Sequence, residues 1–162
     1  MNAKPNLREA PGDLVVSRVF DAPPELVWRA WSVPEHFMKW WGPSQFTSPA
    51  ATLDFRVGGK YHAAMRSPDG RVFWTGGVYR EIVPFRRIVY TDSFADAEGN
   101  IVPASHYGMP DIPIETIVAI TLDDLGGKTK LTLRHTGLPM ADGAKAGWTE
   151  SLEKLAESLK SG

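Results

Sequence analysis

The fold is decided by the C-terminal segment Gly147-Trp148-Thr149-Glu150-Ser151-Leu152-Glu153-Lys154-Leu155-Ala156-Glu157-Ser158-Leu159. Its apolar residues recur at steps of four, three and four, so they share one face of a helix. They are Trp148, Leu152, Leu155 and Leu159. The residues between them are mostly Glu, Lys and Ser, which suit a solvent-facing side. The segment therefore predicts one long amphipathic helix.

The chain from Leu14 to His135 reads as strands and turns, apart from two short helices. The first strand is expected over 14–20, where the residues are β-branched and apolar and end before Pro23-Pro24. Asp21 is expected to cap a short helix over 26–31. Ser32 and Glu35 match a capping box that starts a second short helix, ending near Trp41. Further strands are expected over 60–66, 71–83, 87–92, 116–122 and 129–135.

This order of elements predicts an α+β fold. A curved antiparallel sheet of about six or seven strands, with the two short helices after its first strand, would wrap around the long C-terminal helix. Residues 1–12 are expected to form a flexible tail, and residues 13–162 a single domain. A sheet that is closed by one helix with a narrow apolar stripe often encloses a cavity, and cavities hold ligands.

Composition excludes several classes of function. The 18 basic and 19 acidic residues nearly balance, which indicates no nucleic-acid partner. The absence of Cys excludes disulfides and thiolate sites, and together with an N-terminus that lacks an apolar signal core it suggests a cytoplasmic protein. No run approaches the ~20 apolar residues of a membrane span. His36, His62, His106 and His135 share no metal-ligand spacing, so no metal and no cofactor are expected.

The expected cavity wall combines the inward faces of the strands with the apolar face of the helix. Adjacent helical residues cannot both face inward, so one of Trp40 and Trp41 is expected at the cavity or its entrance, and we choose Trp40. A bulge at Gly76-Gly77 would change the face on which Trp74 lies. The predicted wall residues are Trp40, Tyr61, Met65, Trp74, Tyr79, Glu81, Tyr90, Val118, Leu133, Trp148, Leu152 and Leu155.

Glu81 is the only charged residue in this set. Strict alternation places it on the same strand face as Tyr79 and Gly77. On a concave face its carboxylate would be partly desolvated and could hydrogen-bond a ligand or act as a general base. The alternative is an exposed carboxylate paired with an Arg on the neighbouring strand. No set of catalytic residues is predicted, and Glu81 is the one catalytic candidate.

The stretch from Phe94 to Pro113 fits neither the strand period nor the helix period. It is long and rich in Pro and Gly, yet it carries Ile101, Tyr107, Met109 and Ile112, which a solvated loop would not need. We expect it to lie across one end of the cavity as a lid or to contact a second subunit. The alternative is a disordered insertion.

Motifs spread along the chain resemble one known family. They are Arg18-Val19-Phe20-Asp21-Ala22-Pro23, Val27-Trp28-Arg29-Ala30-Trp31, Trp40-Trp41-Gly42-Pro43, Asp54-Phe55-Arg56-Val57-Gly58-Gly59 and Lys130-Leu131-Thr132-Leu133-Arg134-His135-Thr136-Gly137. They resemble the activator of heat-shock-protein-90 ATPase homologue-like family of the START-like, or SRPBCC, birch-pollen-allergen-like superfamily. This resemblance runs from about Leu14 to Leu159 and implies the helix-grip fold.

The resemblance also implies three functions. Superfamily members bind lipids, hormones or polyketides in an internal cavity, so binding of a small hydrophobic or amphipathic molecule is the preferred expectation. A stress-related co-chaperone with a heat-shock-protein-90 partner is the first alternative. A polyketide cyclase or aromatase is the second, and it would need an acid–base pair such as Glu81 with His62 or Tyr79. A homodimer is a further expectation from the family.

Overall fold

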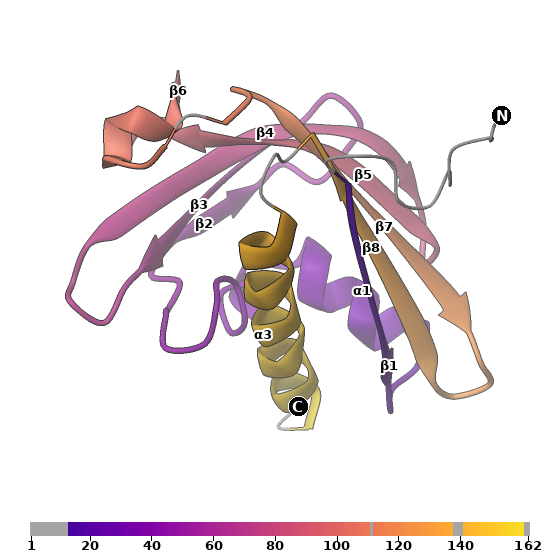
Figure 1. Ribbon diagram of the computed structural model, residues 1–162. Coiled ribbons are helices and arrows are strands. Elements are labelled where there is room, and N and C mark those ends of the chain that lie inside the picture. The colour runs from indigo at the N-terminus through magenta and orange to yellow at the C-terminus, as the bar shows by residue number, and fades with distance from the viewer. Residues whose placement is uncertain (1–12, 111, 138–140, 161–162) are drawn as a thin grey trace, which may run out of the picture.

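The computed structural model describes residues 13–110, 112–137 and 141–160, so the predicted tail over 1–12 lies outside the described residues. A curved antiparallel sheet wraps around one long helix, which confirms the α+β helix-grip architecture (Figure 1). The elements in chain order are β1 (Leu14–Phe20), α1 (Pro24–Ser32), α2 (Pro34–Phe37), β2 (Ala51–Leu53), β3 (Lys60–Arg66), β4 (Val72–Val83), β5 (Arg87–Ala95), β6 (Ile101–Val102), η1 (Ala104–Tyr107), β7 (Thr116–Asp124), β8 (Thr129–Thr136) and α3 (Ala141–Lys160).

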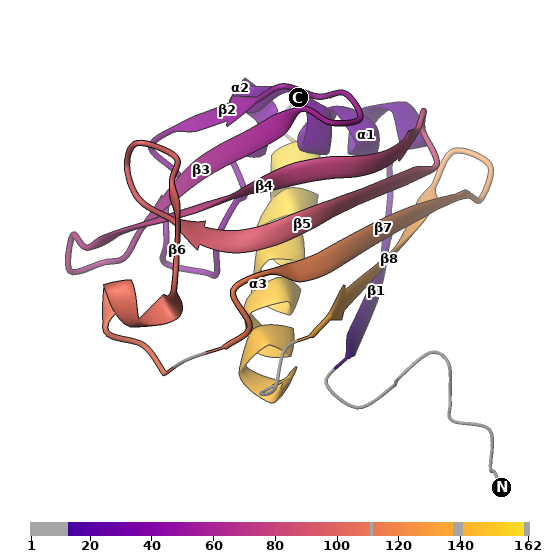
Figure 2. The same cartoon turned by 90° about the horizontal axis from the view of Figure 1, so that it is seen from above.

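The sheet has eight strands in the order β1-β8-β7-β5-β4-β3-β2, with β6 paired to β5. Seen from above, these strands cross over α3, which lies under the concave face of the sheet (Figure 2). The first strand pairs with the last, since Leu14 lies opposite His135 and Phe20 opposite Thr129. This pairing places β1 at one edge of the sheet, beside the last strand of the chain.

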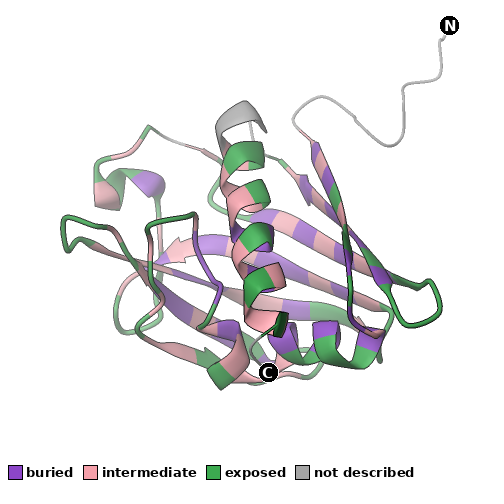
Figure 3. Ribbon diagram, turned by 90° about the horizontal axis from the view of Figure 1, so that it is seen from below, coloured by how far each residue is buried: buried purple, intermediate pink, exposed green. Residues whose placement is uncertain are grey.

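The apolar stripe of α3 faces the sheet as its spacing predicts. Leu152 and Leu155 are 1% and 0% exposed, and the opposite side of the helix is solvent-exposed (Figure 3). Trp148 and Leu159 are partly buried and pack against the same core. An ion pair of 2.6 Å between Arg18 on β1 and Glu153 ties the outer side of the helix to the sheet edge.

The two short helices differ from the predicted ones at their ends. The first begins at Pro24, with Pro23 rather than Asp21 as its N-cap. The Ser32 hydroxyl donates to the Trp28 carbonyl inside α1, so it does not cap the second helix. That helix ends at Phe37 instead of Trp41, because the following residues form turns and the Trp40 side chain is drawn under α1 by a hydrogen bond of 2.8 Å to the Ala30 carbonyl.

Two strands went unpredicted because they are very short. Ala51–Leu53 has three residues and Ile101–Val102 has two, so neither offers enough alternation to read. Ile101–Val102 lies inside the stretch predicted as an irregular loop. Of that stretch, Phe94 and Ala95 extend β5, and Ala104–Tyr107 forms a 3₁₀ helix.

One end of the space between sheet and helix is filled by aromatic rings. We call Trp31, Phe37, Trp40 and Trp41 the aromatic cluster. Its ring centroids lie 4.5 Å apart for Trp31 with Trp40 and 4.5 Å apart for Phe37 with Trp41. All four side chains are at most 5% exposed. The cluster joins the two short helices to the sheet and leaves the other end of the space for the pocket.

Candidate ligand-binding pocket

A pocket of about 450 Å³ lies between the concave face of the sheet and the N-terminal half of α3. Its volume falls within the ~300–1,000 Å³ that ligand sites usually have. The sheet contributes Thr75, Asp92 and Phe94 to the wall. The helix contributes a face of mostly small residues, namely Ala144, Gly147, Trp148 and Ser151. Small side chains on this half of α3 are what leave the space open.

The segment after β5 closes one side of the pocket. Val102, Met109 and Ile112 lie on its wall, although the sequence pattern gave them no regular structure. The segment is anchored through Tyr107, whose hydroxyl donates to the Ala95 carbonyl and accepts from the Trp74 backbone N–H at 3.1 Å. The segment thus forms part of the pocket wall, and its role as a lid or as a subunit contact stays a prediction.

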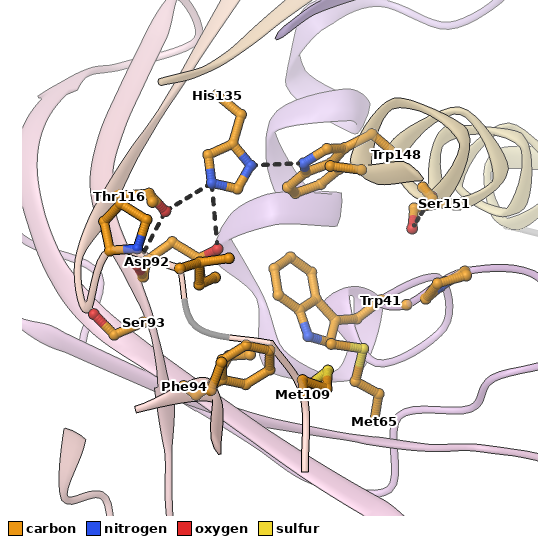
Figure 4. Close-up of a pocket in the computed structure, with 18 of the residues that line it drawn as sticks. Trp41, Met65, Asp92, Ser93, Phe94, Met109, Thr116, His135, Trp148 and Ser151 are labelled. Atoms are coloured by element: carbon orange, nitrogen blue, oxygen red, sulfur yellow. Dashed lines mark hydrogen bonds and ion pairs between the residues drawn. The ribbon is translucent and has the colours of Figure 1, made fainter. Parts of the chain in front are cut away.

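A polar network occupies one end of the otherwise apolar wall (Figure 4). Tyr61 on β3 donates its hydroxyl to Oδ1 of Asp92, and Oδ2 of Asp92 lies 3.7 Å from Nε2 of His135. The Thr116 hydroxyl lies 2.8 Å from the same Nε2 and donates to the Asp92 carbonyl at 3.1 Å. The Trp148 indole N–H donates to Nδ1 of His135 at 3.0 Å.

The directions of these bonds determine the state of His135. An indole N–H is only a donor, so Nδ1 must be an unprotonated acceptor. The Thr116 hydroxyl donates its one hydrogen bond to the Asp92 carbonyl. It must therefore accept a hydrogen bond from Nε2, which carries the imidazole proton. His135 is therefore neutral, and both of its nitrogens are engaged. Burial lowers the pKa of His135, which favours the same neutral form, while the nearby Asp92 opposes that shift.

Asp92 is the one acidic residue of the described pocket wall. Burial raises the pKa of its carboxyl, and the proximity of His135 and the hydrogen bond from Tyr61 act in the opposite direction. Its side chain is 19% exposed. The described wall contains no Lys or Arg. The site thus presents a single carboxylate, beside a hydrogen-bonded network, in a mostly apolar wall.

Of the predicted wall residues, Met65 and Trp148 line this pocket. The choice between the neighbouring tryptophans was wrong, since Trp41 is on the wall and Trp40 is 0% exposed inside the aromatic cluster. Local sequence could not decide this, because the turns after Phe37 replace the helix on which the choice rested.

The remaining apolar predictions lie deeper than the pocket. Tyr61, Tyr79 and Tyr90 surround a second cavity of about 10 Å³ together with Phe37 and Trp41. A space of this size is about that of one water molecule. The other four predicted wall residues are packed in the core instead, each at most 1% exposed. They are Val118, Leu133, Leu152 and Leu155.

Trp74 does not reach the pocket. Its neighbour Thr75 lies on the pocket wall, so alternation directs Trp74 to the outer face of the sheet, where its ring stacks on His62 at 4.3 Å. The pairing of β3 with β4 runs through Gly76 and Gly77 without a register shift. Gly77 instead permits close strand approach, since a Cβ there would lie 1.8 Å from the Thr91 carbonyl oxygen.

Glu81 also lies outside the pocket, and the reason is a β-bulge. Tyr79 pairs with Tyr90 but Glu81 pairs with Val89, so the register shifts between Tyr79 and Glu81. The shift turns Glu81 to the face opposite Tyr79. Its carboxylate is 49% exposed and accepts a hydrogen bond of 3.1 Å from Arg87, the pairing stated as the alternative. Glu81 and Tyr79 thus lie on opposite faces, and His62 is paired with Gly76, further along β4, with its ring stacked on Trp74.

Three polar residues of the site were not predicted: Asp92, Thr116 and His135. A signal for two of them was present in the strand alternation. Asp92 follows Ile88 and Tyr90 at steps of two, and His135 follows Leu131 and Leu133 in the same way. A polar residue that ends an inward-facing apolar series is the pattern to look for. Nothing in the sequence showed that these strand ends meet.

Two further classes of site find no support in the part of the chain that the structure describes. There, no three His, Cys, Asp or Glu side chains gather as metal ligands would. None of the described helices combines the length and apolar content that a membrane crossing requires.

The comparisons with known proteins agree on one family. The family model described as activator of Hsp90 ATPase homolog 1-like protein matches residues 21–160. A Chromobacterium violaceum protein of known crystal structure is 33% identical, with a TM-score of 0.78 over 93% of this chain and 99% of that one. An Arthrobacter aurescens protein solved by NMR is 26% identical, with a TM-score of 0.79 over 94% and 88%. The Silicibacter pomeroyi protein AHSA1 is 26% identical, with a TM-score of 0.71 over 91% and 97%. No functionally curated protein matches this chain.

Proposed function

The chain belongs to the activator of Hsp90 ATPase homolog 1-like family, and we propose that it binds a small hydrophobic or amphipathic molecule between the sheet and α3. The observation that carries the proposal is the pocket of about 450 Å³, whose wall is apolar except for one polar end. Binding of hydrophobic ligands is typical of the family. The neutral imidazole of His135 and the single carboxylate of Asp92 would orient the ligand.

Apolar burial supplies the driving force for such a ligand. Each 100 Å² of apolar surface removed from water contributes about 2.5 kcal/mol before the cost of ordering the ligand is subtracted. The wall offers this surface through Met65, Phe94, Met109 and Ile112. Two of these are methionines, whose flexible side chains adapt to ligands of different shape.

The geometry favours binding over acid–base catalysis by His135. A general base needs a free lone pair and a general acid needs a transferable proton. Nδ1 already accepts a hydrogen bond from the Trp148 indole, and the Nε2 N–H already donates a hydrogen bond to the Thr116 hydroxyl. The cyclase or aromatase alternative therefore finds no free acid–base group at His135 in this arrangement. A co-chaperone role stays a prediction, and a pull-down with the heat-shock-protein-90 chaperone of the same host would test it.

Binding is tested by a neutral fluorescent probe and a variant that fills the pocket. N-phenyl-1-naphthylamine should gain fluorescence with the parent protein. Ser151→Phe places a ring where α3 lines the pocket, and it should weaken probe binding at least tenfold. Thr149→Phe adds the same ring at an exposed position of the same helix and serves as the matched control. Equal binding by both variants would contradict the proposal.

The natural ligand is sought by native mass spectrometry of the protein purified from its own host. A mass adduct that is present in the parent and missing from Ser151→Phe would identify a pocket ligand. An adduct retained by that variant would belong elsewhere on the surface.

A further inference from the structure

We infer that the ligand carries a protonated amine at one end of an apolar body, and that the amine pairs with the carboxylate of Asp92. The inference rests on the proposed function and names the class of molecule that the pocket selects. Three observations carry it: the Oδ2 atom of Asp92 that accepts no hydrogen bond from a described residue, the absence of a cation from the described pocket wall, and the apolar character of most of that wall.

The donors of Tyr61, Thr116 and His135 beside Asp92 are directed at acceptors within the protein. The Tyr61 hydroxyl donates to Oδ1, the Thr116 hydroxyl donates to the backbone carbonyl of Asp92, and the Nε2 proton of His135 goes to Thr116. On the helix side, the Ser151 hydroxyl donates to the Gly147 carbonyl at 3.0 Å. Among the described residues, Oδ2 of Asp92 has only the His135 nitrogen at 3.7 Å, which is beyond hydrogen-bond length. The pocket therefore offers an acceptor that lacks a donor.

No described cation is placed to balance the charge of Asp92. Lys154 is the lysine of α3 beside the pocket mouth, but its ammonium donates to the carbonyls of Gly42, Pro43 and Phe46 at 3.0, 3.0 and 2.8 Å. These three bonds use all three of its donors and hold the loop that follows α2. Arg134, next to His135 in sequence, pairs with Asp13 at 3.0 Å. A cationic ligand would supply the counter-charge that the described residues do not.

A primary ammonium supplies both the hydrogen-bond donor and the positive charge that the residues around Asp92 do not. It brings a positive charge and up to three donors, so it can reach Oδ2 and still bond a water or a hydroxyl. Burial without a counter-charge raises the pKa of Asp92, and an ammonium beside it would lower that pKa again. The remainder of the ligand would lie against Met65, Phe94 and Met109, which offer only apolar contact.

The same groups discriminate against other head groups. A ligand carboxylate or phosphate would be repelled by the charge of Asp92, and the described wall has no Lys or Arg to hold it. A neutral alcohol could donate one hydrogen bond to Oδ2 but would leave the charge unbalanced. The order of affinity expected for one chain length is thus amine, then alcohol, then acid.

The experiment measures how decylamine, 1-decanol and decanoic acid displace N-phenyl-1-naphthylamine at pH 7.5. Decylamine should bind at least tenfold more tightly than 1-decanol, and decanoic acid should bind most weakly. Asp92→Asn keeps the side-chain shape and removes the charge. It should weaken decylamine at least tenfold and change 1-decanol less than threefold. Asp123→Asn removes a carboxylate from an exposed position of β7 and should leave all three affinities unchanged.

A pH series on the parent protein gives a second measurement that needs no variant. The ionisable groups facing Asp92 are Tyr61 from β3, Tyr90 from its own strand and His135 from β8. Burial keeps both tyrosines neutral by raising their pKa values. As the pH falls and Asp92 takes up a proton, the affinity for decylamine should fall while that for 1-decanol stays constant.

The outcomes separate this inference from the proposed function. If 1-decanol displaces the probe but decylamine shows no preference, or if the preference survives in Asp92→Asn, the inference is overturned and the pocket remains a binding site. If none of the three compounds displaces the probe and Ser151→Phe has no effect on it, the proposed function fails and this inference fails with it.

Discussion

The N-terminal half of α3 lines a pocket with Ala144, Gly147 and Ser151, whereas the C-terminal half packs Leu152 and Leu155 against the sheet at no more than 1% exposure. Both halves belong to one helix and face one concave surface (Figure 3). The difference is the size of the inward side chains. Small residues leave the sheet uncovered at one end, while leucines fill the other.

The sheet side shows the same contrast. The aromatic cluster and the leucines fill the space near α1 and α2. Of the three indole N–H groups in the cluster, that of Trp40 donates to the Ala30 carbonyl, and no partner is described for those of Trp31 and Trp41. At the hollow end, Asp92, Thr116 and His135 are linked by hydrogen bonds. The packed half buries most of the apolar side chains of α3, and the hollow half holds the polar network of the pocket.

Removal of a side chain from the packed half should have the largest effect. Leu155→Ala should lower the free energy of unfolding by about 2–5 kcal/mol, because Leu155 is 0% exposed and lies away from the pocket. Urea denaturation with an unchanged m-value measures this. Glu157→Ala on the exposed side of the helix is the control and should stay within about 0.5 kcal/mol. A loss for Leu155→Ala as small as that control would mean that the inward face of α3 is misassigned.

Truncation in the hollow half should be less costly. Met65→Ala should lower the free energy of unfolding by less than about 2 kcal/mol, the low end for buried Met, because a side chain on a cavity wall already lacks neighbours on one side. The same urea experiment compares it with Leu155→Ala. Equal losses in the two variants would remove the contrast between the halves.

Removal of the pocket charge should stabilise the protein. Burial raises the pKa of Asp92, so the folded state binds this proton more tightly than the unfolded state, and stability falls as pH rises from 3.8 through the raised pKa. Asp92→Asn should therefore raise the free energy of unfolding at pH 7. This gain should shrink as pH falls toward 3.8. Asp123→Asn is the exposed control, and a gain that does not depend on pH would argue against a desolvated charge.

His135 should show the opposite pH dependence. Its pKa is lowered in the folded state, so the unfolded chain binds the proton more tightly, and stability falls as pH drops from 6.5 through the lowered pKa. Trp148→Phe removes the donor to Nδ1 and should raise the pKa of His135 toward 6.5. Nitrogen NMR shifts of the imidazole, followed with pH, report both the tautomer and the pKa. Detection of the Nδ1-protonated tautomer in the parent would contradict the assigned bond directions.

The smallest expected effect is a change in hydrogen exchange in the segment from Ile101 to Ile114. This segment contributes Val102 and Ile114, near its two ends, to the pocket wall. Hydrogen exchange with and without decylamine should show slower exchange of its described amides when the pocket is filled. The comparison at two protein concentrations tests the predicted subunit contact, since only that contact makes protection depend on concentration. Protection that changes with neither ligand nor protein concentration would contradict a role of the segment as a lid or as a subunit interface.

Much of the fold could be predicted because its signals are local. The spacing of Leu152 and Leu155 indicates a helix with one buried face, and alternation in 87–92 or 129–135 indicates strands, whatever surrounds them. The elements that escaped prediction are those with too few residues to show a period, such as Ala51–Leu53. The second short helix was overextended because the hydrogen bond from Trp40 to the Ala30 carbonyl is a tertiary contact.

The sequence by itself determined the fold class, the inward face of α3 and the family motifs, because each of these depends on residues close together in the chain. Only the tertiary structure decided the site. One bulge after Tyr79 turned Glu81 outward, and the pairing of β5, β7 and β8 brought Asp92, Thr116 and His135 together. A register shift of one residue reverses every side chain beyond it, and the approach of distant strand ends depends on the whole sheet. Neither is encoded in any single stretch of residues.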